Sequence, residues 1–309
     1  MNKEKLREFI AFLKGKTSLK SEELLEKDFY MSMLLHGIGW RGYAFKGGTC
    51  LSKVYLNYHR ISGDIDFTFV NQEIFGNKTA NQIKKICSEK INLFGKTLEE
   101  FSAEYGFDFK LQKGSRRYVE HGSNNKLATF KIWYRSVFTG AESFIKIQIT
   151  FLEVIKYPIT EKTMLPLADT DTFSETERVY FSDYVGLYKQ QKCLAYDLRE
   201  IASEKIRALL TRRGIKTRDI VDLYFTVEMH KISLDSLKDI CAEKVDFAVK
   251  NYERYKRNIM AGAAFSEKGL LLEDVSHIML AEIDRKDFEM FTSKLPALLE
   301  EIRAASLPE

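Results

Sequence analysis

The stretch that decides the fold is FKGGTCLSKVYLNYHRISGDIDFTFV, residues 45–70. Its last part, residues 64–70, alternates between polar and apolar side chains as a β-strand does. The alternation places Asp64 and Asp66 on one strand face, where their carboxylates can converge on one ion. Two like charges held together are unfavourable, so a neutralising partner is expected. A divalent cation fits, because magnesium binds one or two carboxylates together with substrate phosphate.

A second interpretation needs no ligand: the two aspartates lie on a solvated strand face, one of them paired with Arg60. The preceding glycines favour the metal interpretation. Gly47 and Gly48 join a predicted strand to a helix predicted over residues 49–58, and glycines let the backbone approach a ligand closely. The N-terminus of a helix offers unpaired N–H groups to phosphate, and the hydroxyl of Thr49 adds a donor.

The bulk composition places few limits on function. The chain has 309 residues, of which 45% are hydrophobic, so it is long enough for two domains with substantial cores. A net charge of +4 permits a nucleic-acid partner without arguing for one, because dedicated binders are usually far more basic. The four cysteines lack metal-site or disulfide spacing, which is typical of reduced thiols in a cytoplasmic protein. No segment approaches the ~18 apolar residues of a membrane span, so no membrane partner is expected.

Hydrophobic periodicity predicts an α+β region followed by helices. Residues 2–38 are predicted to form two helices, the second with Ser21 as its N-cap. A polar, turn-rich segment over residues 158–177, where the strand signal fades, places the domain boundary between residues 165 and 166. Beyond the first two helices we expect strands over residues 42–45, 64–70, 107–111, 128–138 and 144–152, and helices over residues 49–58, 81–105, 185–213, 217–230, 233–257 and 284–305.

A glycine turn, a helix and an Asp-x-Asp strand together resemble the signature of the polymerase-β-like nucleotidyltransferases. More narrowly, the chain resembles the AbiEii/AbiGii nucleotidyltransferase toxin family. The order of the motifs agrees with that family, and the match covers most of the chain. The matching segments are EKD at residues 26–28, FKGGTCLSK at 45–53, RISGDID at 60–66, EKIRALLTRR at 204–213 and RDIVDLY at 218–224.

The resemblance implies a polymerase-β-like nucleotidyltransferase domain, residues 1–165, with a mixed, mostly antiparallel sheet. A helical domain, residues 166–309, would follow, with the active site in the cleft. Mg²⁺ or Mn²⁺ on Asp64 and Asp66 would bridge a nucleoside triphosphate, GTP or another. The implied acceptor is RNA, tRNA in particular, and the implied partner is an antitoxin encoded nearby.

The resemblance also implies roles for particular residues. Lys205 would contact the triphosphate, and Asp219 or Asp222, three residues apart on one helix, would complete the catalytic set with Asp64 and Asp66. The nucleotide-binding residues would be Lys46, Gly47, Gly48, Thr49, Lys53, Ser62, Lys205 and Arg212. Local clusters of basic residues, and not the resemblance, give the predicted RNA-binding residues: Arg116, Arg117, Arg212, Arg213 and Arg218. Without the resemblance, Arg218 and Asp222 would be interpreted as an ordinary i,i+4 ion pair and Lys205 as a solvated side chain.

One position departs from the wider superfamily. Many polymerase-β-like enzymes carry a third metal-binding acid on a strand equivalent to residues 144–152, and here Gln148 occupies that place. Glu153, the nearest acid, is out of phase. The departure leaves two alternatives to RNA transfer open: transfer to a hydroxyl of a protein or small molecule, and a nucleotide-binding module without catalysis.

Overall fold

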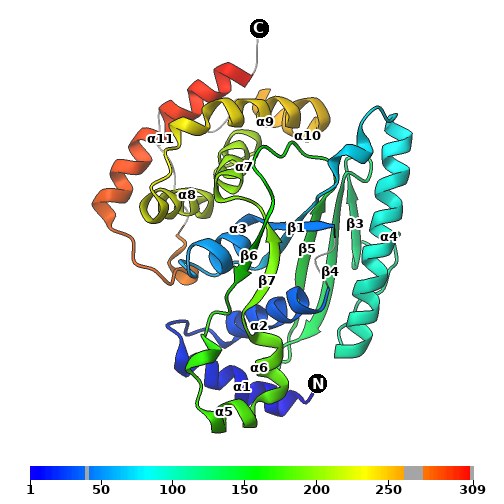
Figure 1. Ribbon diagram of the computed structural model, residues 1–309, viewed down its shortest axis with the longest axis vertical. Helices are drawn as coiled ribbons and strands as arrows, with labels where there is room; N and C mark the ends of the chain where they lie inside the picture. The colour runs from blue at the N-terminus through cyan, green and yellow to red at the C-terminus, as the bar shows by residue number, and fades with distance from the viewer. Residues whose placement is uncertain (39–41, 261–273, 307–309) are drawn as a thin grey trace. The chain divides into compact units, whose positions relative to one another are not determined.

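The computed structural model (Figure 1) describes residues 1–38, 42–260 and 274–306. The chain divides into two compact units, each assembled from two segments. The sheet unit comprises Met1–Leu152 and Glu161–Ala195, and the helical unit comprises Glu153–Thr160 and Tyr196–Glu309. Both units are therefore discontinuous in sequence, whereas the sequence predicted a single boundary between residues 165 and 166.

A mixed sheet forms the centre of the sheet unit. In the described part of the chain it has seven strands, in the order β3-β4-β5-β2-β1-β7-β6. Strand β4 pairs antiparallel with β3 and β5, β2 pairs antiparallel with β1 and parallel with β5, and β1 pairs parallel with β7. This arrangement confirms the predicted α+β class. The strands are β1 (Tyr43–Lys46), β2 (Asp64–Phe69), β3 (Val119–Gly122), β4 (Leu127–Arg135), β5 (Glu142–Thr150), β6 (Thr160–Met164) and β7 (Gln191–Ala195).

The helices of the sheet unit include the predicted N-terminal pair. As expected, Ser21 caps the second of them, because its Oγ accepts a hydrogen bond of 3.3 Å from the backbone N–H of Leu24. Phe9 of the first helix joins the pair to a later one by packing its ring 5.6 Å from Phe29 and 5.4 Å from Tyr184. The helices are α1 (Lys3–Lys16), α2 (Glu22–Gly37), α3 (Gly47–Cys50), α4 (Ala80–Tyr105), α5 (Glu175–Tyr180) and α6 (Ser182–Tyr188).

The sheet has one apolar face and one polar face, because side chains alternate along each strand. On β5, Ile147 is completely buried, whereas its neighbours Lys146 and Gln148 are half-buried. Helix α4 covers the apolar face, where its Phe94 ring lies 5.3 Å from Phe130 of β4. Figure 1 shows α4 running alongside β3 and β4. The polar face is therefore the one that carries both aspartates of β2.

Three expectations for the sheet unit were wrong in detail. The helix predicted over residues 49–58 is the short α3 followed by a π-helical turn, Leu51–Tyr55. The strand predicted over residues 107–111 is an isolated bridge between Asp108 and Trp133, with no continuous ladder. The segment predicted to lose strand character contains β6, and β3 was not predicted. These strands are short and polar, so tertiary pairing and not intrinsic propensity determines them.

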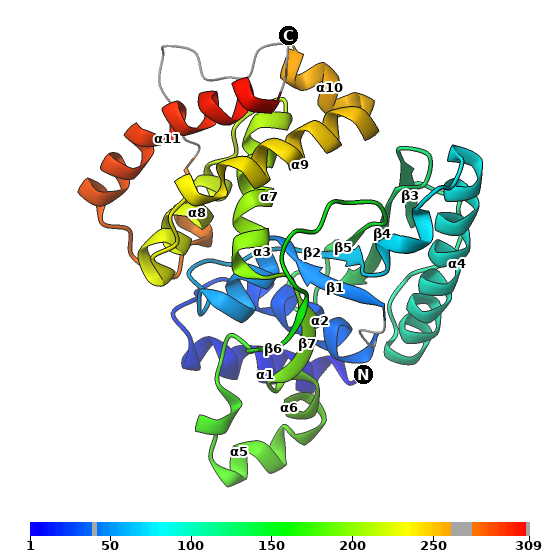
Figure 2. The ribbon, with the colours of Figure 1, turned by 45° about the horizontal axis from the view of Figure 1, so that its top comes forward.

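The helical unit packs around its own apolar core. Ile206, Leu223, Val245 and Leu299 belong to this buried cluster. Figure 2 shows α9 beside α11, and α7 against α9. The helices are α7 (Leu198–Thr211), α8 (Thr217–His230), α9 (Lys238–Asn251), α10 (Glu253–Met260) and α11 (Arg285–Ser306). None of the helices in the described ranges is long and apolar enough to cross a membrane.

The sequence predicted α8 with its bounds but missed breaks in two longer helices. The helix predicted over residues 185–213 is divided into α6, β7 and α7, because Ala195 pairs with Phe45 of β1 and Asp197 caps α7. The helix predicted over residues 233–257 is divided at Tyr252, whose backbone is extended. A parallel pairing with a strand 150 residues earlier leaves no periodic signal in the sequence.

Candidate active site

The glycine turn between β1 and α3 lies directly against Asp66. Gly47 has a φ of +75°, in the left-handed region, and a Cβ there would overlap with Oδ2 of Asp66. At Gly48 a Cβ would lie 2.7 Å from Nη2 of Arg60 and 3.1 Å from Oγ of Ser62. Only glycine fits at these positions without displacing a neighbour. The turn thus places bare backbone beside a carboxylate, a guanidinium and a hydroxyl.

Asp64 and Asp66 share the polar face of β2, where both are half-buried. The register with β5 places Lys146 opposite Asp64 and Gln148 opposite Asp66, and β1 places Lys46 opposite Asp66. Nζ of Lys146 lies 2.6 Å from Oδ2 of Asp64, and the two side chains are 28% and 30% exposed. Lys146 is a site residue that the sequence did not predict. Lys146 lies two residues before Gln148 and therefore on the same strand face, and this alternation is the feature of the sequence that could have identified it.

Two further side chains reach Asp64 or the turn before it. The Thr49 hydroxyl donates a hydrogen bond to the backbone carbonyl of Asp64, which ties α3 to β2. Nζ of Lys27, on α2, lies 3.2 Å from the position that a Cβ at Gly63 would occupy. Burial lowers the pKa of Lys27; the charge of Asp64 opposes this shift and that of Lys146 adds to it. Lys27 is therefore a site residue that the sequence presented only as part of a motif.

The position of the third acid is neutral, as the sequence indicated. Gln148 lies opposite Asp66, and its Nε2 donates a 3.3 Å hydrogen bond to Oγ1 of Thr129. Glu153 belongs to the helical unit. Within the described residues, no group of three or more His, Cys, Asp and Glu side chains is arranged to hold a metal. A cation here would rest on Asp64 and Asp66, and two carboxylates completed by substrate phosphate suit magnesium.

Lys53, expected to contact phosphate, is instead part of a buried network. Its side chain is 0% exposed, and its Nζ lies 2.8 Å from Oδ1 of Asp28 and 2.9 Å from Oγ of Ser32. The hydroxyls of Tyr58 and Tyr188 each donate to Asp28 over 3.2 Å. The network links α2 to the π-helical turn and α6. A phosphate could reach this ammonium only if the network opened, so we do not retain Lys53 as a proposed ligand.

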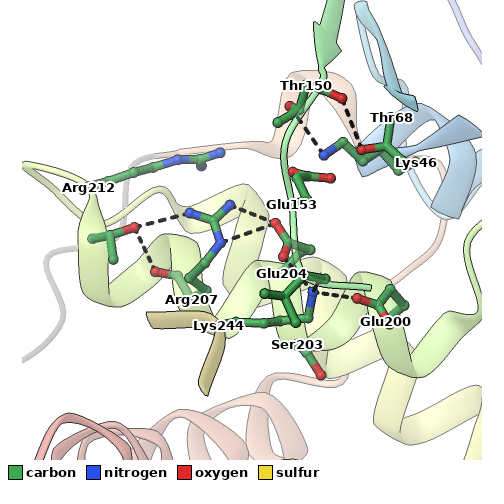
Figure 3. A network of polar contacts seen from close by, with 12 residues as sticks. Lys46, Thr68, Thr150, Glu153, Glu200, Ser203, Glu204, Arg207, Arg212 and Lys244 are labelled. Carbon is green, nitrogen blue, oxygen red and sulfur yellow. Dashed lines mark hydrogen bonds and ion pairs between the residues drawn. The ribbon is translucent and has the colours of Figure 1, made fainter. Parts of the chain in front are cut away.

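Lys46 lies at the end of β1, on the polar face. Its Nζ donates a 3.4 Å hydrogen bond to Oγ1 of Thr150 on β5. Oγ1 of Thr68 donates to the Thr150 carbonyl over 3.3 Å, and Figure 3 shows the three side chains together. The ammonium of Lys46 is thus held beside the glycine turn by the strand that also carries Lys146.

In the helical unit the structure brings together Lys205, Asp219 and Asp222. Nζ of Lys205 lies 2.6 Å from an oxygen of each carboxylate, and Arg212 forms an ion pair with Asp219. Both carboxylates are almost completely buried. Burial opposes the ionisation of Asp219, but Lys205 and Arg212 hold its pKa below the usual value. The sequence predicted these residues as a set, although not that the acids bind the lysine.

A second charged cluster lies on α7 and α9 of the same unit (Figure 3). Lys244 forms ion pairs with Glu200 and Glu204, and its Nζ donates to the carbonyl of Val154 over 2.6 Å. Arg207 pairs with Glu204 over 2.6 Å. The cluster attaches the segment after β5 to α7. The charged side chains of α7 that take part in it therefore have a structural role.

The predicted RNA-contacting arginines differ in environment. The Arg117 guanidinium lies 2.8 Å from a carboxylate oxygen of both Asp108 and Glu142, and it covers the Trp133 ring at 4.3 Å. Arg212 is held by Asp219, as described above. The remaining three are exposed: Arg116, Arg213 and Arg218.

The chain matches one family model, that of the nucleotidyl transferase AbiEii toxins of type IV toxin–antitoxin systems, over residues 40–306. The matched region contains the glycine turn, both aspartates of β2 and the lysine–aspartate cluster of α7 and α8. The family match therefore identifies a nucleotidyltransferase, for which a nucleoside triphosphate is the substrate. The chain belongs to the AbiEii toxin family, as the sequence motifs indicated, and an antitoxin is accordingly its partner.

Two solved structures from Helicobacter pylori are similar to the chain, each at 15% identity. JHP933 aligns over 94% of this chain and 95% of its own length with a TM-score of 0.40. A candidate nucleotidyltransferase aligns over 93% and 97% with a TM-score of 0.41. Among curated proteins no match was found. The assignment rests on the family match alone.

Proposed function

We propose that this toxin is a metal-dependent enzyme that transfers a nucleoside monophosphate from a nucleoside triphosphate to a hydroxyl of RNA, and of tRNA in particular. One observation carries the proposal: the Gly47-Gly48 backbone lies against Asp66, on the strand face that also presents Asp64. A phosphate chain can approach a bare glycine backbone closely, and the two carboxylates offer the oxygen donors that a divalent cation requires.

In this proposal the sheet unit binds the reacting phosphates. Asp64 and Asp66 would hold Mg²⁺ or Mn²⁺, which when bound neutralises phosphate charge and polarises the phosphorus–oxygen bonds. The turn of Gly47 and Gly48 gives the phosphates room, and Lys46 offers an ammonium beside it. Ser62 can donate its hydroxyl at the same turn. The incoming hydroxyl attacks the α-phosphorus, and pyrophosphate leaves.

The residues of the helical unit enter the proposal on the family motif. We assign Lys205 and Arg212 to the triphosphate, and Asp219 or Asp222 to general-base chemistry. The lowered pKa of Asp219 keeps this carboxylate ionised near neutral pH, so it accepts hydrogen bonds and does not donate them. In the structure, both acids form ion pairs with Lys205.

The test is transfer of label from α-³²P nucleoside triphosphates to fractionated cell RNA, protein and small metabolites. The wild type should label RNA. Asp66→Asn should not, whereas Glu120→Gln, which removes an acid paired with Lys131 on the neighbouring strands, should label RNA normally. Label in the protein or metabolite fraction alone would redirect the assignment to those acceptors. Nucleotide binding without any transfer would indicate a module without catalysis.

The cellular setting follows from the acceptor. An enzyme that modifies tRNA acts in the cytoplasm, and growth arrest by this modification is what the antitoxin would restrain. Expression of the toxin with and without its antitoxin should therefore change the labelled fraction of tRNA in cells, and Asp66→Asn should abolish both the label and the growth arrest.

A further inference from the structure

The carboxylate of Asp64 already has a cation. Nζ of Lys146 lies 2.6 Å from its Oδ2, and the two residues are register partners on parallel strands. A strand register is a rigid constraint, because a slip by one residue would move every side chain of β5 to the other face. The register therefore holds the backbones of Asp64 and Lys146 side by side, within reach of this ion pair.

Three lysines lie near the two aspartates. Asp64 and Asp66 provide two negative charges. Lys146 is paired with the first, Lys46 is the register partner of the second, and Lys27 reaches the turn before β2. The usual third acid is absent at Gln148. A divalent cation arriving alone would meet ammonium groups, whose repulsion at short range opposes binding.

We propose that Lys146 occupies Asp64 in the resting protein and that the divalent cation binds tightly only together with the triphosphate, which then takes over the Lys146 ammonium. The inference rests on the proposed function, because it assumes that Asp64 and Asp66 hold the metal. A triphosphate brings more negative charge than one divalent cation neutralises, so it compensates both the metal and the displaced ammonium. Metal and nucleotide should therefore bind with strong positive coupling.

The same sheet face supplies a matched control. Lys131 is the register partner of Lys146 on β4, but its Nζ lies 2.5 Å from Oε1 of Glu120 and not on a site carboxylate. Both lysines are partly exposed, so neither substitution leaves a buried charge unpaired. Lys146→Met and Lys131→Met differ mainly in whether the removed ammonium neutralises Asp64.

The experiment measures Mn²⁺ binding by electron paramagnetic resonance of the free ion, with and without the α,β-methylene analogues of the four ribonucleoside triphosphates. The wild type should bind Mn²⁺ weakly alone and tightly with an analogue. Lys146→Met should bind Mn²⁺ alone more tightly, by up to about fivefold, since a partly exposed ion pair opposes binding by up to ~1 kcal/mol. Its analogue affinity should fall about tenfold, and Lys131→Met should behave as the wild type.

Each alternative outcome is decisive. If Lys146→Met binds Mn²⁺ alone no better than the wild type and Lys131→Met, the ammonium does not compete with metal and the inference is overturned. Lys146→Gln repeats the test with a polar side chain, which excludes a packing effect of methionine. If no variant binds Mn²⁺ even with an analogue, or Asp66→Asn binds it as the wild type does, the metal site of the proposed function fails instead.

Discussion

At the scale of single residues, the site depends on a position where a side chain cannot exist. Gly47 combines a φ of +75° with a Cβ position that Oδ2 of Asp66 already fills. Gly140, in the β4–β5 turn, has a similar φ of +69° but open space around it. Substitutions at the two glycines can therefore separate the cost of backbone strain from the cost of displacing a carboxylate.

We expect Gly140→Ala to lower the free energy of unfolding by about 1–2 kcal/mol, the cost of left-handed backbone for an L-residue. Gly47→Ala should cost more and should also abolish transfer, because Asp66 must move. Urea unfolding and the labelling assay measure the two effects. Equal stability of the two variants, with transfer intact in Gly47→Ala, would show that Asp66 is not held by the turn.

Lys53 gives the second prediction at this scale. Its buried pair with Asp28 predicts that Lys53→Met lowers the free energy of unfolding by about 3–5 kcal/mol, because Asp28 would be left charged and buried. Lys14→Met removes a lysine whose pair with Glu22 is 38% exposed on each side, and should cost about 0–1 kcal/mol. A stable Lys53→Met that loses only triphosphate affinity would restore the phosphate-binding role expected from the sequence.

Single residues also show where sequence reasoning ends. The aspartate pair and the glycine turn belong to one strand–helix–strand unit within 20 residues of chain, so their proximity could be predicted from the local pattern. Lys146 and Lys27 reach the same place, the first from 82 residues after Asp64 and the second from an earlier helix. No spacing encodes a parallel register across that distance, so the cation on Asp64 required the structure.

At the scale of elements, long amphipathic helices were predicted and short strands were not. Helix α8 was predicted with its bounds because its apolar residues recur at helical spacing. Strand β7 pairs with β1 but reads as part of a helix, and β6 lies in a polar segment. Both segments form strands because they pair with neighbouring strands of the sheet. The intrinsic β-propensity of a segment does not include this tertiary pairing, so it cannot predict such strands.

The pair of helices α7 and α8 gives a prediction for pH. The pKa of Asp219 is lowered in the folded protein, so its ionised form stabilises the fold above the ordinary pKa of about 4. That contribution is lost as the pH falls below 4 through the folded value. Asp219→Asn should therefore cost about 1.5–3 kcal/mol at pH 6, and the difference from the wild type should shrink toward pH 3.

Urea unfolding of both proteins between pH 6 and pH 3 measures this difference. Asp246→Asn is the matched control, because Asp246 forms an exposed i,i+4 pair with Lys250 and should change stability by less than about 0.5 kcal/mol. A wild-type minus Asp219→Asn difference that is constant with pH would mean that Asp219 has an ordinary pKa and that its role is packing.

At the scale of the whole molecule, family membership was accessible from motifs and the division into units was not. Each unit takes two segments of chain, because the chain leaves the sheet unit after Leu152 and returns at Glu161. A composition change marks only one of these crossings. The order of the motifs along the chain is unaffected by this discontinuity, so the family could be predicted from it. The predicted boundary at residues 165 and 166, in contrast, falls inside a segment of the sheet unit.

The net charge of +4 gives the last prediction, because RNA binding then depends on local clusters and not on the total. Arg213 and Arg218 are exposed, whereas Arg212 is held by Asp219, so the first two are the residues to neutralise. Each lost phosphate contact should make the slope of log K against log salt shallower by about 0.7 for single-stranded RNA, or ~1.4 for Arg213→Gln with Arg218→Gln. Arg285→Gln with Lys286→Gln, two exposed charges on α11, should leave the slope unchanged. If both double variants keep the wild-type slope in filter-binding titrations, Arg213 and Arg218 do not contact RNA.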